Sequence, residues 1–485
     1  MPISRILALA AALAAAALPL AALEFAPRAS LTASTETNES VWAEAGLSVT
    51  HEAAGFEFSC DGSVDTSGTY GGFFGGGFGT GNLSILVNEG GLRWKGDRLS
   101  LEAGKLALRD VVDSPYSLFL SGRGNEALTA EVRYEDGGFF FRDRWIALNY
   151  DSENADASKG SWPDRSAVLK TYGVKVGEFR AGFQDLVVYT GESRMADDRG
   201  PLFDAEYFLN PMPGVLLQFT GTSMDAPWEK NSRIDDNSIT GFFVAWEREG
   251  LSADAQILID DFNMNRFLSP GSYQNPDKLA WTAGASMDTP YGRFRLDHAG
   301  ATAYTFSASS GHEADNPVLD YGYTFYPAAS FDIDGSAQTI SPESNYVGYL
   351  HGENNLAFMA SWFDRLGAID AAASLELVLS GSKCPQDPWH ELSSFPDGTR
   401  FLDDSVLEKR LLLSGKAMWR LGGGFEFFAT GSVGYVWNKL ALKNLAVVAD
   451  DGSVSATETV AVYVPSEESA AIGSLKLGGL WRLKL

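Results

Sequence analysis

The five histidines are the first residues to test for chemistry, because an imidazole can act as a general base or bind a metal ion. They are His51, His298, His312, His351 and His390. None belongs to an HExxH motif or forms a close pair with the spacing of metal ligands. His298 is the best single candidate for a base, and we expect it instead to be a hydrogen-bonded residue facing the interior. Because no G-x-S-x-G elbow is present either, the sequence predicts no catalytic residue and no enzyme.

Two acidic turns are the next candidates, since paired carboxylates can hold a divalent cation. They are Asp332-Ile333-Asp334-Gly335 and Asp450-Asp451-Gly452. Neither has the ligand spacing and distal Glu of a calcium loop, so we expect solvated turns, no metal site and no cofactor. The two cysteines, Cys60 and Cys384, cannot form a metal cluster alone. Their separation in the sequence leaves open whether they pair.

Charge and composition exclude further classes of protein. The 485 residues include 37 Lys and Arg against 63 Asp and Glu, a net charge of −26. Nucleic-acid binding needs clustered cations, so we expect no nucleic-acid partner. A hydrophobic share of 45% argues against disorder.

The first 22 residues have the pattern of a secretory signal peptide. Arg5 supplies the positive start, Ile6–Leu18 is an unbroken apolar run, and Ala21-Ala22 offers a small-residue cleavage site. This run is shorter than the ~20 residues of a membrane-spanning helix. We therefore predict a signal peptide at residues 1–22 and an exported domain at residues 23–485.

Alternation of apolar and polar residues continues through most of the exported domain. In Phe425–Trp437, Phe, Ala, Gly, Val, Tyr and Trp occupy the odd positions, and Glu426, Thr430 and Ser432 lie between them. This run has 13 residues, whereas strands of soluble sheets average ~5–6 residues and tilted membrane strands need ~9–11. Its length favours a strand of a transmembrane barrel over a strand of a soluble multi-sheet protein, which stays the alternative.

Short turns and long polar stretches separate these runs. Asp136-Gly137-Gly138 and Leu421–Gly424 are hairpin signals, whereas Asp151–Ser166 and Ser382–Gly398 are long. Such asymmetry is typical of outer-membrane barrels. The last strand, Leu475–Leu485, is apolar on one face, like the assembly signal of those barrels. We predict an all-β, antiparallel transmembrane β-barrel of ~14–18 strands with long extracellular loops.

Three landmarks follow one another between Gly182 and Leu268. They are the strand end Val187–Gly191, the segment Tyr207–Pro211, and Asp236–Ser238 followed by the strands Ile239–Trp246 and Ile257–Asp261. In this order they resemble the capsule-assembly (Wzi-type) family of bacterial outer-membrane barrels. The residues that carry this likeness are Tyr189, Tyr207, Asn210, Pro211, Asp260 and Asp261. Upstream, Ser114–Ser121 is similar to the end of another segment of that family.

The resemblance implies an outer-membrane barrel that binds or retains exopolysaccharide at the cell surface. Its partners would be the lipid bilayer or lipopolysaccharide, a surface polysaccharide and the barrel assembly machinery. A porin-like channel for ions or small solutes is the alternative, and the acidic balance predicts that an open pore would prefer cations.

Two details of the landmarks can be interpreted from the residues themselves. Pro211 and Pro213 cannot lie inside a central strand, so Asn210-Pro211 marks a strand end or a re-entrant turn. We expect Asp260 and Asp261 to be solvated residues at a strand end.

Sugar-binding residues are expected in loops that combine aromatic faces with planar polar groups. Trp162, Trp228 and Trp389 lie in such loops, although girdle residues at a membrane interface would look the same. The candidate ligand-binding residues are Trp228, Asn231, Arg233, Asp236 and Asn237.

Overall fold

The computed structural model describes most of the predicted exported domain. The described residues are 23–35, 41–66, 76–80, 83–122, 126–149, 165–190, 203–221, 237–262, 276–306, 331–333, 336–338, 347–383, 398–448 and 454–484. The predicted signal peptide, Met1–Ala22, lies outside them. Within the described ranges, no helix is long and apolar enough to cross a membrane.

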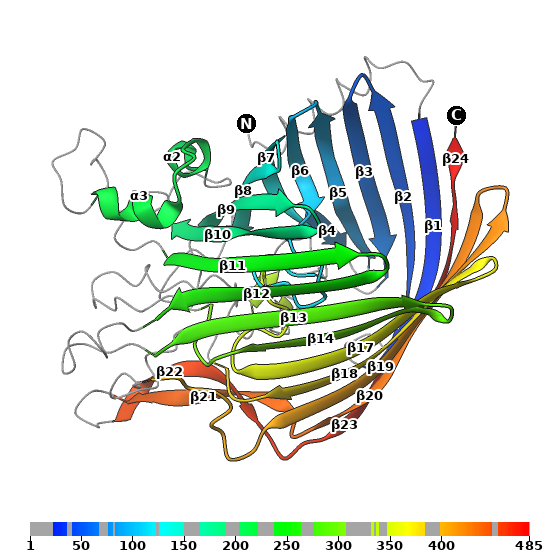
Figure 1. Ribbon diagram of the computed structural model, residues 1–485. Coiled ribbons are helices and arrows are strands. Elements are labelled where there is room, and N and C mark those ends of the chain that lie inside the picture. Colours follow the sequence, from blue (N-terminus) through cyan, green and yellow to red (C-terminus); the bar gives the residue numbers. More distant parts are fainter. Residues whose placement is uncertain are drawn as a thin grey trace.

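The described strands form a closed antiparallel barrel (Figure 1). The main sheet has 20 strands, of which 18 close the barrel in the described part of the chain. These are β1 (Leu23–Ser34), β2 (Val41–Ala53), β3 (Phe56–Asp65), β5 (Leu83–Lys95), β6 (Leu99–Ala107), β7 (Glu126–Asp136), β8 (Phe139–Asn149), β9 (Arg165–Val176), β10 (Phe179–Thr190), β11 (Asn237–Arg248), β12 (Leu251–Asp261), β13 (Lys278–Thr289), β14 (Gly292–Ala301), β17 (Asn355–Leu366), β18 (Ile369–Ser380), β19 (Glu408–Gly422), β20 (Phe425–Trp437) and β23 (Ala470–Trp481). The predicted all-β, antiparallel barrel is confirmed, with a strand number at the top of the expected range.

Closure joins the last long strand to the first. β23 pairs with β1 in the register Leu31↔Leu477, and the short β24 (Leu483–Lys484) pairs with the start of β1 through Phe25↔Leu483. The short β4 (Gly76–Thr80) pairs with the first half of β5. Two hairpins lie outside the closed circuit, β15 (Phe331–Ile333) with β16 (Ser336–Gln338), and β21 (Leu440–Val448) with β22 (Val454–Pro465).

The two ends of the barrel differ, as the turn signals predict. One end, which we call the turn end, carries tight hairpins at Gly55, Gly137-Gly138, Gly250 and Gly422–Gly424, where a positive φ favours glycine. The opposite end, the loop end, carries the long connections. Two short helices in the β10–β11 connection, α2 (Ala205–Leu209) and α3 (Gly214–Gly221), lie near the loop ends of β8–β10 in Figure 1.

Side chains alternate between an outward apolar face and an inward face that carries most of the charged groups. On β20, Phe425, Phe427, Val433, Tyr435 and Trp437 are exposed on the outward face, and neighbouring strands continue this apolar surface. Inward-facing positions carry ion pairs near the turn end and an apolar cluster near the loop end. An apolar outer surface of this extent is the pattern of a barrel surrounded by lipid.

Candidate functional site

The lumen contains an inserted segment that the strand pattern did not predict. Residues 108–122, between β6 and β7, contain hardly any regular secondary structure and fold into the barrel, and we call them the plug segment. Its side chains Leu118, Phe119 and Leu120 are fully buried. They belong to one apolar cluster with inward-facing residues of the wall, among them Ile146, Leu169, Leu186 and Leu258. At Gly241 on β11, a Cβ atom would lie 2.9 Å from the Phe119 ring, so this glycine makes room for the plug segment.

Asp110 joins the plug segment to two strands of the wall. Its carboxylate accepts hydrogen bonds from the backbone N–H of Phe119 at 3.1 Å and of Leu120 at 3.2 Å. The same carboxylate accepts from Gln184 Nε2 at 2.8 Å and from Gln256 Nε2 at 3.1 Å. Gln256 Oε1 in turn accepts from Leu118 N at 2.8 Å. Because buried polar groups are costly when unpaired, this network fixes the segment in one position.

A second set of buried contacts holds the plug segment from the opposite side. Tyr116 donates a hydrogen bond to Glu376 Oε1 on β18 at 2.8 Å, and His351 Nε2 lies 2.9 Å from the same oxygen. Burial, followed by the nearby Glu376 carboxylate, raises the pKa of Tyr116 well above its ordinary value, so the phenol stays a donor at neutral pH. His351 belongs to residues 347–354, which also fold into the lumen and are buried.

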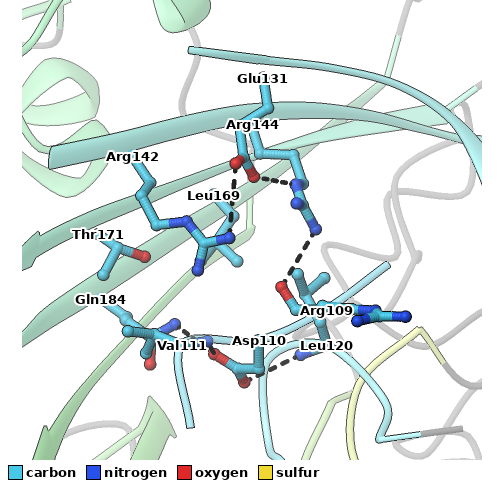
Figure 2. A pocket seen from close by; sticks show the side chains of 10 residues that line it. All are labelled: Arg109, Asp110, Val111, Leu120, Glu131, Arg142, Arg144, Leu169, Thr171 and Gln184. Carbon is cyan, nitrogen blue, oxygen red and sulfur yellow. Dashed lines mark hydrogen bonds and ion pairs between the residues drawn. The ribbon is translucent and has the colours of Figure 1, made fainter. Parts of the chain in front are cut away.

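Arg142 and Arg144 lie across a small cavity from the plug residues Asp110, Val111 and Leu120 (Figure 2). Arg144 on β8 is buried, with Nη2 3.1 Å from Glu102 and Nη1 donating to the carbonyl of Arg109 in the plug segment at 3.2 Å. Its Nε pairs with Glu131, and Arg142 Nη2 lies 3.5 Å from the same carboxylate. Arg144 therefore connects the wall to the plug segment, and its ion pairs with Glu102 and Glu131 hold its side chain in place.

The opposite side of the lumen carries more exposed ion pairs. Near the closure, Lys476 lies 2.8 Å from Glu44, and Arg482 pairs with Glu426 at 3.5 Å. The Lys476 side chain keeps 37% exposure and the Arg482 side chain 47%. The plug residues thus belong to a buried cluster with the wall from β7 to β18, whereas the ion pairs near the closure are more exposed.

The predicted ligand-binding residues fall mostly outside the described ranges. Trp228, Asn231, Arg233 and Asp236 lie there, as do Trp162 and Trp389. Asn237 is the first residue of β11 and is half-buried. These residues therefore remain predictions.

The structure brings together four of the family-motif residues on the outside of the barrel. Tyr189 and Tyr207 stack with their ring centroids 5.3 Å apart. Asn210 and Pro211 form the corner between α2 and α3, and their carbonyls accept hydrogen bonds from Lys170 and Tyr172 of β9. Of the two alternatives for Asn210-Pro211, the structure shows the turn.

Two expectations about single residues are wrong. Asp260 is not a solvated residue, since it is 8% exposed and its Oδ2 accepts from Phe306 N at 2.8 Å, next to β14. His298 is hydrogen-bonded as expected, but it faces outward, because it pairs with the exposed Ala283 and lies on the face opposite Asp297. It accepts from Trp281 Nε1 at 3.1 Å and stacks on Phe358. Asp261 ends β12.

The described part of the chain includes possible metal ligands and one of the two cysteines. There, no group of three or more His, Cys, Asp and Glu side chains is arranged to hold a metal ion. Cys60 is a free thiol exposed on the outward face of β3. Cys384 lies outside the described residues.

The closed antiparallel barrel, with turns at one end and long connections at the other, has the fold of outer-membrane β-barrels. Among solved structures, it is similar to Wzi of Escherichia coli, described as an outer-membrane protein involved in group 1 capsule assembly and a carbohydrate-binding β-barrel. The TM-score is 0.50 at 9% identity, over 99% of this chain and 87% of that one. At this identity the likeness shows the fold alone.

Two barrels of Pseudomonas aeruginosa are also similar. OprD has a TM-score of 0.45 at 9% identity, over 96% of this chain and 95% of that one. OccK8 (OprE) has a TM-score of 0.47 at 8% identity, over 96% and 98%. No protein-family model and no curated protein sequence matches the chain.

Proposed function

We propose that this protein is an outer-membrane barrel of the capsule-assembly (Wzi-like) type, which binds or retains exopolysaccharide at the cell surface. It would be exported through a cleaved signal peptide at residues 1–22 and inserted by the barrel assembly machinery. The apolar outward face would contact the lipid bilayer and lipopolysaccharide. The long connections at the loop end would then face the outside of the cell, where a polysaccharide is available.

The observation that carries this proposal is the fixed plug segment. Asp110, Gln184 and Gln256 hold it by buried hydrogen bonds, and Leu118, Phe119 and Leu120 pack into the apolar cluster of the wall. A diffusion pore needs a continuous water-filled path, whereas a surface anchor needs a rigid platform for its binding loops. A segment bonded to several strands across the lumen supports the second role.

A porin-like channel is the second candidate, and the exposed charges near the closure favour it. Arg482, Lys476 and Arg420 face the lumen with between a third and a half of their side chains exposed. Charged side chains of this kind line the paths of channels. Ion conductance separates the two functions.

Retention of polysaccharide tests the first proposal directly. Immobilised protein is incubated with the surface polysaccharide of the source organism, and the retained sugar is measured. The double variant Trp228→Ala/Arg233→Ala removes the indole ring of Trp228 and the guanidinium N–H donors of Arg233. We expect it to retain at least about tenfold less, the equivalent of ~1.4 kcal/mol. An exposed substitution at the turn end, Asp97→Ala, serves as the matched control. If the wild-type protein retains no sugar, the proposed role is wrong.

A further inference from the structure

Three ionisable side chains lie in one row on the outward face of the barrel wall. The register aligns Asp143 of β8 with Lys170 of β9, and Lys170 with Asp185 of β10. Their neighbours Leu169, Gln184 and Leu186 point the other way, into the cluster and hydrogen bonds of the plug segment. The row therefore faces away from the lumen. All three side chains are nevertheless buried.

The segment that buries them is the β10–β11 connection at residues 203–221, which we call the outer strap. Its apolar contacts with the outward face are made by Tyr207 and Leu217, which cluster with Trp145, Val168 and Val187. The strap begins at the loop end, where Asp204 N donates to the Tyr189 hydroxyl at 3.1 Å. It descends through α2, turns at residues 210–213 and returns through α3.

At the corner formed by residues 210–213, backbone carbonyl groups accept hydrogen bonds from side chains of the barrel wall. Lys170 Nζ donates to the carbonyls of Asn210 at 2.5 Å and Met212 at 2.8 Å. Tyr172 donates to the carbonyl of Pro211 at 2.6 Å. The carbonyl of Pro213 accepts from Leu216 and Leu217 inside the strap.

The donors of the corner are satisfied as well. Asn210 N bonds to the carbonyl of Glu206, and Met212 N to Asn210 Oδ1. Gly214 N and Val215 N both donate to the Asp185 carboxylate, and Pro211 and Pro213 have no N–H to satisfy. In a loop surrounded by water, such N–H and C=O groups can form hydrogen bonds with the solvent. In a hydrocarbon environment, the protein itself must supply all of their hydrogen-bond partners.

The corner also lies at the depth of the apolar outer surface. Lys170 is in the middle of β9, with the exposed Val174 and Val176 between it and the turn end. Phe179 and Phe242 extend the same exposed apolar surface on β10 and β11. An uncovered charged row at this depth would face lipid at a cost of several kcal/mol.

The outer surface of the strap continues that apolar surface. Leu209 is 72% exposed, and Met212 and Leu216 are also exposed. No charged residue occurs from Tyr207 to Gly221. Apolar residues therefore surround the corner on the side away from the wall.

We propose that the outer strap is a re-entrant membrane segment, whose exposed residues Leu209, Met212 and Leu216 contact the acyl chains of the outer leaflet. Lys170, Tyr172 and Asp185 supply from the barrel wall the hydrogen bonds that water cannot supply there. The partner of this surface is the hydrocarbon layer of the membrane. The proposal rests on the membrane setting of the proposed function, and the test below separates the two.

Spin labels in liposomes report which solvent surrounds each position, since oxygen concentrates in lipid and a nickel chelate stays in water. Labels are placed at Leu216→Cys and at Asp97→Cys, a turn residue, both in a Cys60→Ala/Cys384→Ala background. The native Cys60, labelled in a Cys384→Ala protein, is the reference for the lipid-facing wall. We expect position 216 to match Cys60, with a ratio of oxygen to nickel accessibility several-fold above that at position 97.

Two further labels keep the test valid if the change at Leu216 disturbs packing. Glu206→Cys, near the loop end, should be more accessible to nickel than Leu209→Cys. Heat-dependent migration in gels checks that every labelled protein is folded. Water-like values at 209 and 216 with a lipid-like value at Cys60 would overturn the strap proposal alone. Water-like values at Cys60 as well would overturn the membrane setting and the strap proposal together.

Discussion

Asp110 shows how one side chain can fix an irregular segment inside a barrel. The segment around it contains hardly any regular secondary structure, so its backbone N–H groups need partners other than a strand or a helix. The carboxylate accepts from three of these groups, those of Val111, Phe119 and Leu120, and from the amides of Gln184 and Gln256. These five donors on one carboxylate connect the plug segment to the wall.

Replacing Asp110 by Ala should therefore release the plug segment. The change leaves buried donors without partners, each at a cost of ~1–3 kcal/mol. We expect the temperature at which the barrel unfolds in gel-migration assays to fall, and proteolysis within residues 108–122 to rise. Asp113→Ala, an exposed carboxylate in the same segment, is the control and should behave like wild type. Equal behaviour of the two variants would contradict the anchoring role of Asp110.

Lys170 has the corresponding role on the outside of the barrel. Lys170→Met keeps the length of the side chain but leaves the carbonyls of Asn210 and Met212 without their donor. We expect chymotrypsin to cut the outer strap near Tyr207 and Phe208 faster than in wild type, by about tenfold or more if ~1.4 kcal/mol of anchoring is lost. Lys175→Met, an exposed residue of the same strand, should leave the rate unchanged. If both variants are cut at the wild-type rate, Lys170 does not hold the strap.

The sequence identified part of this anchoring system. Tyr207, Asn210 and Pro211 stood out by their pattern, and the two prolines indicated a turn. Asp110 and Gln184 did not stand out, because they are 74 residues apart and are joined only by the folded wall. The burial of Asp260 does not follow from the sequence, because it depends on residues 302–306, which fold back over the end of β12.

At the scale of elements, alternation located the strands well. Phe425–Trp437 is expected and observed as a strand with the same bounds. On a strand of this length, the two-residue period assigns each side chain to one of the two faces of the sheet. The hairpins at Gly137-Gly138 and Gly422–Gly424 follow from their glycines. The plug segment and the outer strap have no such period, so their placement depends on tertiary contacts.

The strand pair next to the closure, β20 and β23, offers a stacked contact that can be tested. Phe425 of β20 and Trp481 of β23 stack with centroids 4.9 Å apart and ring planes 5° apart. A double-mutant cycle with Phe425→Ala and Trp481→Ala should give a coupling of ~0.5–1.5 kcal/mol in urea unfolding of the liposome-inserted protein. Phe425→Ala combined with Trp437→Ala, at the other end of β20, should be additive. Additivity in both cycles would show that the stack contributes nothing to the pairing of β20 with β23.

At the scale of the whole molecule, the charge of −26 does not describe the lumen. The described lumen pairs cations with anions, as in the contacts of Arg144 with Glu102 and of Lys476 with Glu44. The net charge therefore does not give the sign of the charge in the lumen. Passage of solutes through the barrel depends on the plug segment rather than on the net charge.

Single-channel conductance in planar bilayers tests the plugged lumen most directly. Wild-type protein is compared with a variant in which residues 113–119, the middle of the plug segment, are replaced by two glycines. We expect the wild-type protein to give only small, rare conductance steps, and the variant to give large, long-lived ones. Large cation-selective steps from the wild-type protein, equal to those of the variant, would contradict the plugged barrel and favour the porin-like function.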